Sequence, residues 1–174
     1  MEEYEFHSAW YVLHTRSRFE QVVFDGLGRK SLEAFLPKMS VLSKRRDRRK
    51  TIRVPLFPGY VFVKSDLNVH ERLEIVKTVG VVRLVGNKDG PVPVPDESID
   101  SLKIMVAGDH PIATGTRLRR GDRVIVLEGP FAGVTGIFVR YRGSGRVIVS
   151  IEALGQYAAV DVPEECVERI PGGA

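Results

Sequence analysis

Residues that could carry catalytic or metal chemistry are few and scattered in this chain of 174 residues. The four histidines, His7, His14, His70 and His110, have none of the Glu-x-x-His or His-x-x-x-His spacing found in metal sites. Cys166 is the single cysteine, so it can form no internal disulfide and has no second thiol or grouped histidines to share a metal. We therefore predict neither a metal nor a cofactor.

One glycine-rich stretch, "GLGRKS" at residues 26–31, superficially suggests a phosphate loop. It lies at the end of a predicted helix, whereas a phosphate loop joins a strand to the start of a helix. No Gly-x-Ser-x-Gly, Walker or dinucleotide motif occurs, and the carboxylates lie mostly beside basic residues, as on a solvated helix face. The sequence predicts a binding protein and not an enzyme.

The stretch "PLFPGYVFVK", residues 55–64, is the first candidate binding motif. A strand here would turn Tyr60 and Phe62 to one face and Val61 and Val63 to the other. The aromatic pair could lie in the core or could anchor a partner, because buried aromatic side chains dominate protein interfaces. The pattern alone favours burial.

The basic charge of the chain is concentrated in its first part. Residues 1–107 hold 18 Lys and Arg against 14 Asp and Glu, whereas residues 108–174 hold 8 of each. Much of the surplus lies in "KRRDRRKTIR", residues 44–53, with seven basic residues and one acidic residue. Such a run is either a solvated loop or a segment that follows phosphates.

Hydrophobic periodicity predicts a mixed α/β arrangement over about the first 100 residues. We expect helices at 17–30, 68–77 and 96–106, with Ser17–Glu20 and Asn68–Glu71 as capping pairs and Asp96 as the third cap. Strands are predicted at 9–15, 33–37, 52–57, 60–64 and 80–86, and the basic run is read as a loop.

Beyond the third helix the composition changes. Residues 108–117 contain glycine, proline and small polar residues, which predicts a linker, and five short β-rich runs follow, which suit a small barrel. The predicted division is therefore 1–107, 108–117 and 118–174. No apolar run is long enough to span a membrane, and the acidic N-terminus differs from a secretory signal, so we expect a cytoplasmic protein.

Two motifs together resemble the bacterial NusG transcription elongation factors: "PLFPGYVFV" and "GDRVIVLEGPFAGVTGIFV", the latter at residues 121–139. The likeness extends from residue 10 to about 170 and includes Trp10–Tyr11 and "TVGVVRLVG". It implies an α+β fold in which an N-terminal NusG domain, an antiparallel sheet flanked by helices, is joined by a flexible linker to a small all-β SH3-like KOW barrel.

For the N-terminal part, the resemblance implies a domain that binds the clamp helices of RNA polymerase and contacts the opposing lobe. The non-template DNA would run past this domain. The residues carried over for the polymerase are His14, Leu56, Phe57, Pro58, Tyr60 and Phe62 for the clamp helices, with His70 and Arg72 for the lobe. Those assigned to nucleic acid are Arg16 and Arg18, which precede or open the first helix, and the basic run Lys44, Arg45, Arg46, Arg48, Arg49 and Lys50.

For the KOW part, the resemblance implies the ribosome, termination factor Rho or nascent RNA as partner. The candidate partner-binding residues are Phe131, Ile151, Leu154 and Gln156. In "IEALGQY", Leu154 and Gln156 stand where housekeeping members usually carry an aromatic residue and an arginine, which places Rho and ribosome binding in doubt. The two motifs are closer to specialised paralogues of the RfaH type, which antagonise termination in particular operons.

The function that follows is a monomeric elongation factor that suppresses pausing and modulates termination, with processive antitermination of specific operons as the preferred form. The alternatives are a housekeeping NusG that couples transcription to Rho or the ribosome, and a KOW-containing RNA-binding or ribosome-associated protein. The neutral charge balance of the second part argues against RNA binding by that part alone.

Overall fold

The computed structural model describes residues 7–44, 50–116 and 121–171. Contacts between Cα atoms divide the chain into two compact units. Unit 1 comprises residues 1–36 and 57–96, and unit 2 comprises residues 37–56 and 97–174. Residues 97–106 therefore group with the later part of the chain, although the boundary predicted from the sequence lies after residue 107. The division into domains at 1–107, 108–117 and 118–174 stays a prediction.

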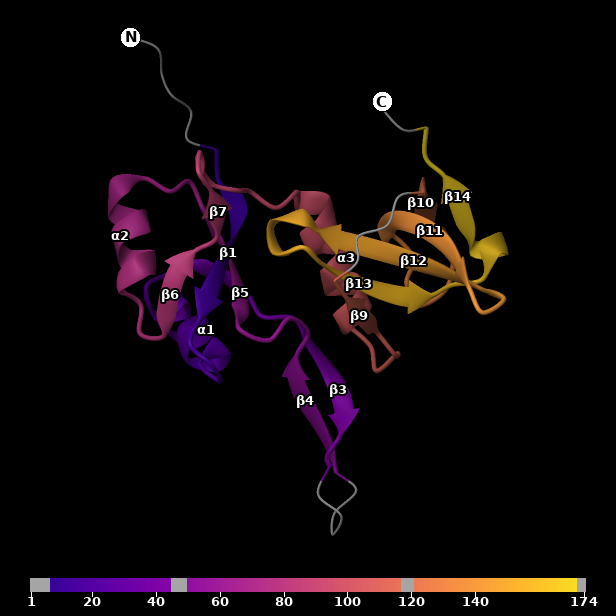
Figure 1. Cartoon of the computed structure of the whole chain (residues 1–174), viewed down its shortest axis with the longest axis horizontal. Helices are drawn as coiled ribbons and strands as arrows, with labels where there is room; N and C mark the ends of the chain where they lie inside the picture. The colour runs from indigo at the N-terminus through magenta and orange to yellow at the C-terminus, as the bar shows by residue number, and fades with distance from the viewer. Residues whose placement is uncertain (1–6, 45–49, 117–120, 172–174) are drawn as a thin grey trace. The chain divides into compact units, whose positions relative to one another are not determined.

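Unit 1 is built on a four-stranded antiparallel sheet with the strand order β2-β5-β1-β6 (Figure 1). Its strands are β1 (Ala9–Thr15), β2 (Glu33–Phe35), β5 (Tyr60–Ser65) and β6 (Val81–Leu84). A short hairpin of β7 (Gly86–Asn87) and β8 (Gly90–Pro91) follows. The predicted strands of this part are thus present, with shorter bounds at several ends.

Two helices, α1 (Glu20–Arg29) and α2 (Val69–Lys77), supply the core on one face of this sheet. Val23 and Leu27 of α1 and Ile75 of α2 pack with alternate residues of β1 and β5, all of them almost fully buried. The members of this cluster are Leu13, Val23, Leu27, Leu32, Val61, Val63 and Ile75. The prediction that Val61 and Val63 face the core is confirmed.

The predicted helix caps have different outcomes. Asn68 caps α2, since its side-chain oxygen accepts from the N–H of Glu71 over 2.9 Å. The Ser17–Glu20 capping pair is wrong, because α1 begins at Glu20 with Phe19 as the N-cap residue and has no side-chain cap bond. The Glu20 carboxylate instead reaches Gly59. Asp96 is the first helical residue of α3 and not the residue before it.

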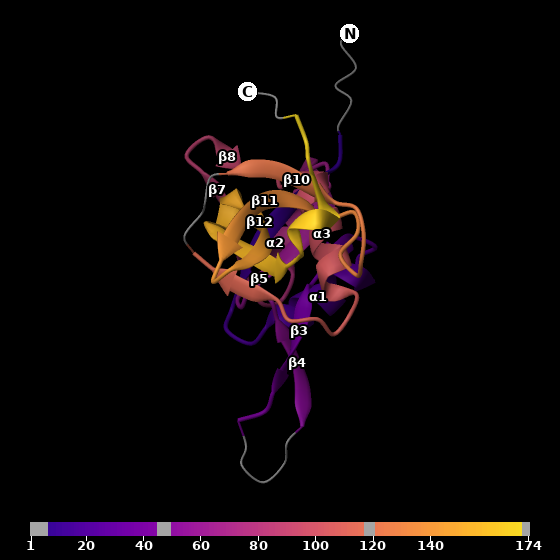
Figure 2. The same cartoon turned by 90° about the vertical axis from the view of Figure 1, so that its right-hand side faces the viewer.

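Unit 2 contains a β-hairpin, one helix and a β barrel. The hairpin pairs β3 (Lys38–Leu42) with β4 (Thr51–Pro55). β4 overlaps the strand predicted at 52–57 and includes residues 51–53 of the basic run, so the prediction of a loop is wrong for that end of the run. The helix is α3 (Asp96–Val106). The barrel strands have the order β14-β10-β11-β12-β13-β9 and are seen almost end-on in Figure 2.

All five predicted β-rich runs of the second part form barrel strands. They are β10 (Asp122–Val126), β11 (Thr135–Tyr141), β12 (Ser144–Ile151), β13 (Gln156–Asp161) and β14 (Val167–Arg169), with 3-10 turns at Glu152–Leu154 and Glu164–Cys166. β9 (Ala113–Gly115) completes the sheet by pairing with β13, although it lies inside the predicted linker. The predicted fold class, an antiparallel α/β part followed by a small all-β barrel, is confirmed.

Helix α3 is tied to the barrel by one serine and one ion pair. The buried Ser101 hydroxyl accepts from the N–H of Thr135 over 3.0 Å and donates to its carbonyl oxygen over 3.3 Å. Glu97 pairs with Arg123 over 2.6 Å. Because Thr135 is the first residue of β11, Ser101 satisfies backbone groups at the start of this barrel strand.

Candidate binding surfaces

The motif "PLFPGY" forms a tight turn that is fixed by neighbouring elements. The N–H of Tyr60 donates to the carbonyl of Phe57 over 3.2 Å, and Gly59 between them has φ of 87°. Proline at the second position and glycine with positive φ at the third are the signature of a type II turn. The proline therefore lies before β5 and removes no hydrogen bond from the sheet.

Two further bonds fix Gly59 from the outside. Its N–H donates to Oε1 of Glu20 over 2.8 Å, and its carbonyl accepts from the N–H of Thr15 over 2.8 Å. Glu20 is buried at the start of α1, so α1 holds the turn through this carboxylate and β1 holds it through the N–H of Thr15. This arrangement holds Pro58 exposed at the surface.

The aromatic residues around the turn differ in exposure. Phe62 packs edge-on against Phe57, with ring centroids 6.3 Å apart, and both side chains are almost completely buried. Phe35 lies 6.0 Å from Phe62 and 6.5 Å from Trp10, which makes one aromatic cluster on the sheet face opposite Val61 and Val63. Phe62 therefore lies on the predicted face but has no solvent exposure in this structure.

The accessible part of the predicted polymerase patch is Pro58, His14 and Tyr60. His14 and Tyr60 are cross-strand partners, are half-buried, and have ring centroids 5.4 Å apart at an interplanar angle of 33°. Leu56 and Phe57 are only 2% and 1% exposed, so a partner that touches them or Phe62 must first expose them. The binding role of all six residues stays a prediction.

Arg16 and Arg18 lie where a nucleic acid could reach them. Both are exposed on the segment between β1 and α1, and neither guanidinium is paired with a carboxylate within the described ranges. The N–H of Arg16 donates to the carbonyl of Gly80 over 2.8 Å, and Arg18 has φ of 64°. The backbone here is therefore held in place while the two cations face solvent.

The basic run is only partly described. Lys44 and Lys50 are exposed at the ends of the β3–β4 hairpin, and the carbonyl of Lys50 accepts from the N–H of Ser43 over 2.8 Å. The other predicted nucleic-acid residues of the run, Arg45, Arg46, Arg48 and Arg49, lie outside the described residues.

Helix α2 presents a stripe of exposed apolar side chains that the sequence interpretation missed. His70 and Arg72, predicted to contact the polymerase lobe, are exposed at its start. Beside them Val69 is 88% exposed, Leu73 45% and Val76 44%. Their spacing of four and three residues was visible in the sequence as one helix face. Because an apolar helix face at this spacing usually packs against a core, the spacing alone does not show that the face is exposed. We call Val69, Leu73 and Val76 the α2 stripe.

The barrel places its four predicted partner residues at different depths. Phe131 is 7% exposed and Ile151 1%, while Leu154 and Gln156 are half-buried on either side of Gly155, whose φ is 62°. Phe131 also meets the ring of His110 edge-on at 5.2 Å. The sequence interpretation did not connect His110 with this loop.

No group of three or more metal-ligating side chains occurs among the described residues. In the described part of the chain, no helix has the length and apolar character needed to cross a membrane. The surfaces found are a fixed turn with aromatic neighbours, exposed cations and a barrel. They are divided between the two units.

Comparison with known proteins places this chain in a family. The family model described as "Transcription termination factor nusG" matches residues 8–103. "Transcription termination/antitermination protein NusG" of Pseudomonas aeruginosa is 29% identical over 92% of this chain and 98% of that protein. The protein of the same name from Thermus thermophilus is 31% identical over 82% of this chain and 89% of that protein. The chain therefore belongs to the NusG family of transcription factors.

Among solved structures, "Domain interaction in Thermotoga maritima NusG" aligns with 94% of this chain and 98% of that chain. The identity is 24% and the TM-score is 0.49.

Proposed function

We propose that this chain is a transcription elongation factor that binds RNA polymerase through unit 1, suppresses pausing and modulates termination. The observation that carries the proposal is the fixed Phe57–Tyr60 turn, which keeps Pro58 exposed beside the His14 and Tyr60 rings. Membership of the NusG family supports it. The proposed contacts are the clamp helices at this turn, the opposing lobe at His70 and Arg72, and non-template DNA at Arg16 and Arg18.

The proposed mechanism is a shift between polymerase states and involves no chemical step by this chain. A factor that binds the closed, moving polymerase tenfold better than the paused form favours the former by about 1.4 kcal/mol. The chain would act as a monomer in the cytoplasm, with no cofactor. The fixed turn suits this role because a preorganised contact loses little conformational entropy on binding.

The test is single-round transcription with purified polymerase and a template that carries a defined pause. The full chain should shorten the pause lifetime, and Tyr60→Ala should weaken the effect at equal concentration. Unchanged pausing under conditions where the factor is bound to polymerase would refute the proposal.

The form of the activity depends on the barrel. We propose processive antitermination at specific operons over a housekeeping role, because Leu154 and Gln156 occupy the positions where an aromatic residue and an arginine are usual. A Rho-dependent termination assay separates the two. Reduced termination supports the specialised role, and enhanced termination supports the housekeeping factor.

RNA binding by the barrel is a second candidate, favoured by one aromatic side chain. Tyr141 is 39% exposed at the end of β11, with the guanidinium carbons of Arg142 and Arg146 at 5.3 and 4.5 Å from its ring centroid. An exposed ring between cations can stack on an unpaired base. This function predicts that the full chain binds single-stranded RNA and that Tyr141→Ala abolishes the binding.

A further inference from the structure

Two cavities meet over Val162 and Pro163, at the C-terminal end of β13. The first has a volume of ≈ 350 Å³ and the second ≈ 570 Å³, and both also include Asp161 in their walls. Volumes of about 300–1,000 Å³ are those of typical ligand sites. Because Asp161, Val162 and Pro163 line both cavities, the two lie next to each other.

The smaller cavity is mainly apolar, and the His110 ring is the main side-chain donor in its lining. Pro111, Pro130 and Pro163 contribute apolar rings and have no N–H. Phe131 and Val162, 7% and 4% exposed, complete the apolar lining. A bulky aliphatic or aromatic side chain fits these walls, whereas a ligand that needs many donors does not.

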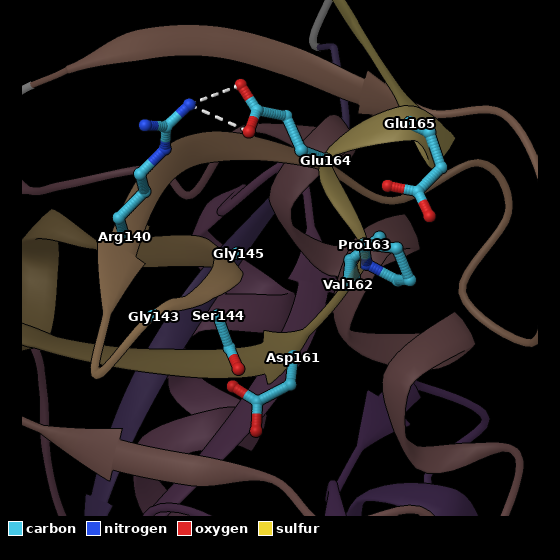
Figure 3. Close-up of a pocket in the computed structure, with 9 residues that line it drawn as sticks. All are labelled: Arg140, Gly143, Ser144, Gly145, Asp161, Val162, Pro163, Glu164 and Glu165. Carbon is cyan, nitrogen blue, oxygen red and sulfur yellow. Dashed lines mark hydrogen bonds and ion pairs between the residues drawn. The ribbon is translucent and has the colours of Figure 1, made fainter.

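The rim of the two cavities carries carboxylates, two of which have no counter-ion. Asp161 is paired with Arg146 at 2.9 Å, and Glu164 with Arg140 at 2.6 Å. Glu128 at the smaller cavity and Glu165 at the larger one are exposed and have no cationic partner among the described residues. In Figure 3, Arg140 is joined to Glu164, and Glu165 extends on the other side of Pro163.

This charge distribution selects between classes of ligand. Nucleic acids and small anions are disfavoured, because the single guanidinium in the wall of the larger cavity, that of Arg140, is engaged by both oxygens of Glu164. A positively charged group would meet Glu128 and Glu165 instead. The site thus combines an apolar hole with an anionic rim.

We propose that this double cavity binds an extended segment of a partner protein in which a bulky apolar residue is followed by lysine or arginine. The apolar side chain enters the cavity lined by Phe131 and Val162, and the cation crosses Pro163 toward Glu165. This site is independent of polymerase binding by unit 1. It gives the barrel a protein partner with basic and apolar character.

The experiment records amide NMR spectra of the full chain with three blocked peptides. They are Ser-Leu-Lys-Lys-Ser, its acidic counterpart Ser-Leu-Glu-Glu-Ser, and Ser-Ser-Lys-Lys-Ser, which lacks the apolar side chain. Such short contacts give dissociation constants on the order of 1 mM. The first peptide should shift the amides of Phe131, Val162 and Cys166, and the other two should bind at least about fivefold more weakly, as expected for one lost charge pair or apolar contact.

Charge-reversal variants assign the binding to this rim. Glu128→Lys and Glu165→Lys should each weaken the Leu-Lys-Lys peptide about fivefold. Glu168→Lys is the matched control, because Glu168 is exposed three residues away and lines neither cavity. No shift with the first peptide, equal binding of the acidic peptide, or an equal loss in the Glu168→Lys variant would each overturn the proposal.

Discussion

At the scale of single residues, Glu20 is the group on which the Pro58–Gly59 turn depends. Its buried carboxylate accepts from Gly59 N–H at 2.8 Å, and it does not cap α1. In the Glu20→Ala variant this N–H loses its partner, so the free energy of unfolding should fall by about 1–3 kcal/mol. Urea denaturation measures the loss.

The isosteric variant Glu20→Gln serves as the control for this prediction. Its amide oxygen can still accept from Gly59, so the loss of stability should be smaller than in Glu20→Ala. An equal loss in both variants would show that the negative charge matters, and no loss in either would remove the turn's dependence on this residue.

Tyr60 and Phe62, two residues apart on one strand face, should respond differently to truncation. Phe62 is fully buried between Phe35 and Phe57, so Phe62→Ala should cost about 3–5 kcal/mol of folding stability. Tyr60 is half-buried, so Tyr60→Ala should cost less folding stability than Phe62→Ala and should instead weaken polymerase binding. Thermal denaturation and a polymerase-binding titration of both variants separate the roles, and a stable Phe62→Ala protein would contradict the observed packing.

At the scale of elements, α2 bonds its half-buried acidic side chains to neighbouring segments and packs Ile75 into the core, while Val69, Leu73 and Val76 stay exposed. Glu71 bonds to Ser65, and Glu74 lies 3.6 Å from Lys30, whose ammonium also donates to the Glu74 carbonyl. The α2 stripe is thus exposed beside Arg72. If this helix contacts polymerase, the partner surface should be apolar and acidic.

Leu73→Glu tests that contact with little risk to the fold. Leu73 is 45% exposed, so the variant should lose at most about 1 kcal/mol of stability while polymerase affinity falls by about tenfold or more, since a charge replaces an apolar contact. Leu127→Glu is the matched control, because Leu127 is 53% exposed on the barrel unit. Equal polymerase affinity of both variants and the unaltered chain would exclude the α2 stripe from the interface.

The elements also show what the sequence could predict. Alternation and helical spacing located the strands and helices of the first part because each has one continuous apolar face, as Val61 and Val63 illustrate. β4 overlaps the strand predicted at 52–57, whereas β3 was missed because none of its residues is buried and it therefore lacks a clear core-facing pattern. The pattern favoured burial of the aromatic pair, and Phe62 is indeed buried, whereas the Ser101–Thr135 bonds join residues far apart in the sequence, which a local pattern cannot encode.

At the scale of the whole molecule, Ser101 decides how firmly α3 stays attached to the barrel within unit 2. Ser101→Ala removes both bonds to Thr135, so the Thr135 amide and the α3 amides should exchange with solvent faster, by about tenfold or more. Hydrogen exchange by NMR measures this opening. Ser98→Ala on the same helix is the control, and equal acceleration in both variants would show that the Thr135 bonds are not the cause.

The uneven charge of the chain leads to the last prediction, on salt dependence. The surplus of basic residues lies within residues 1–107, and the exposed Lys44 and Lys50 flank its densest run. If these lysines follow phosphates in a transcription complex, replacing both by glutamine should weaken binding mainly at low salt. The slope of the logarithm of the binding constant against the logarithm of salt concentration should then flatten by about 1–2, because the variant makes fewer phosphate contacts and releases fewer counter-ions when it binds.

Lys88→Gln is the control, since Lys88 is exposed between β7 and β8 and lies outside the run. A parallel shift at all salt concentrations, or no change, would show that these two lysines do not contact nucleic acid.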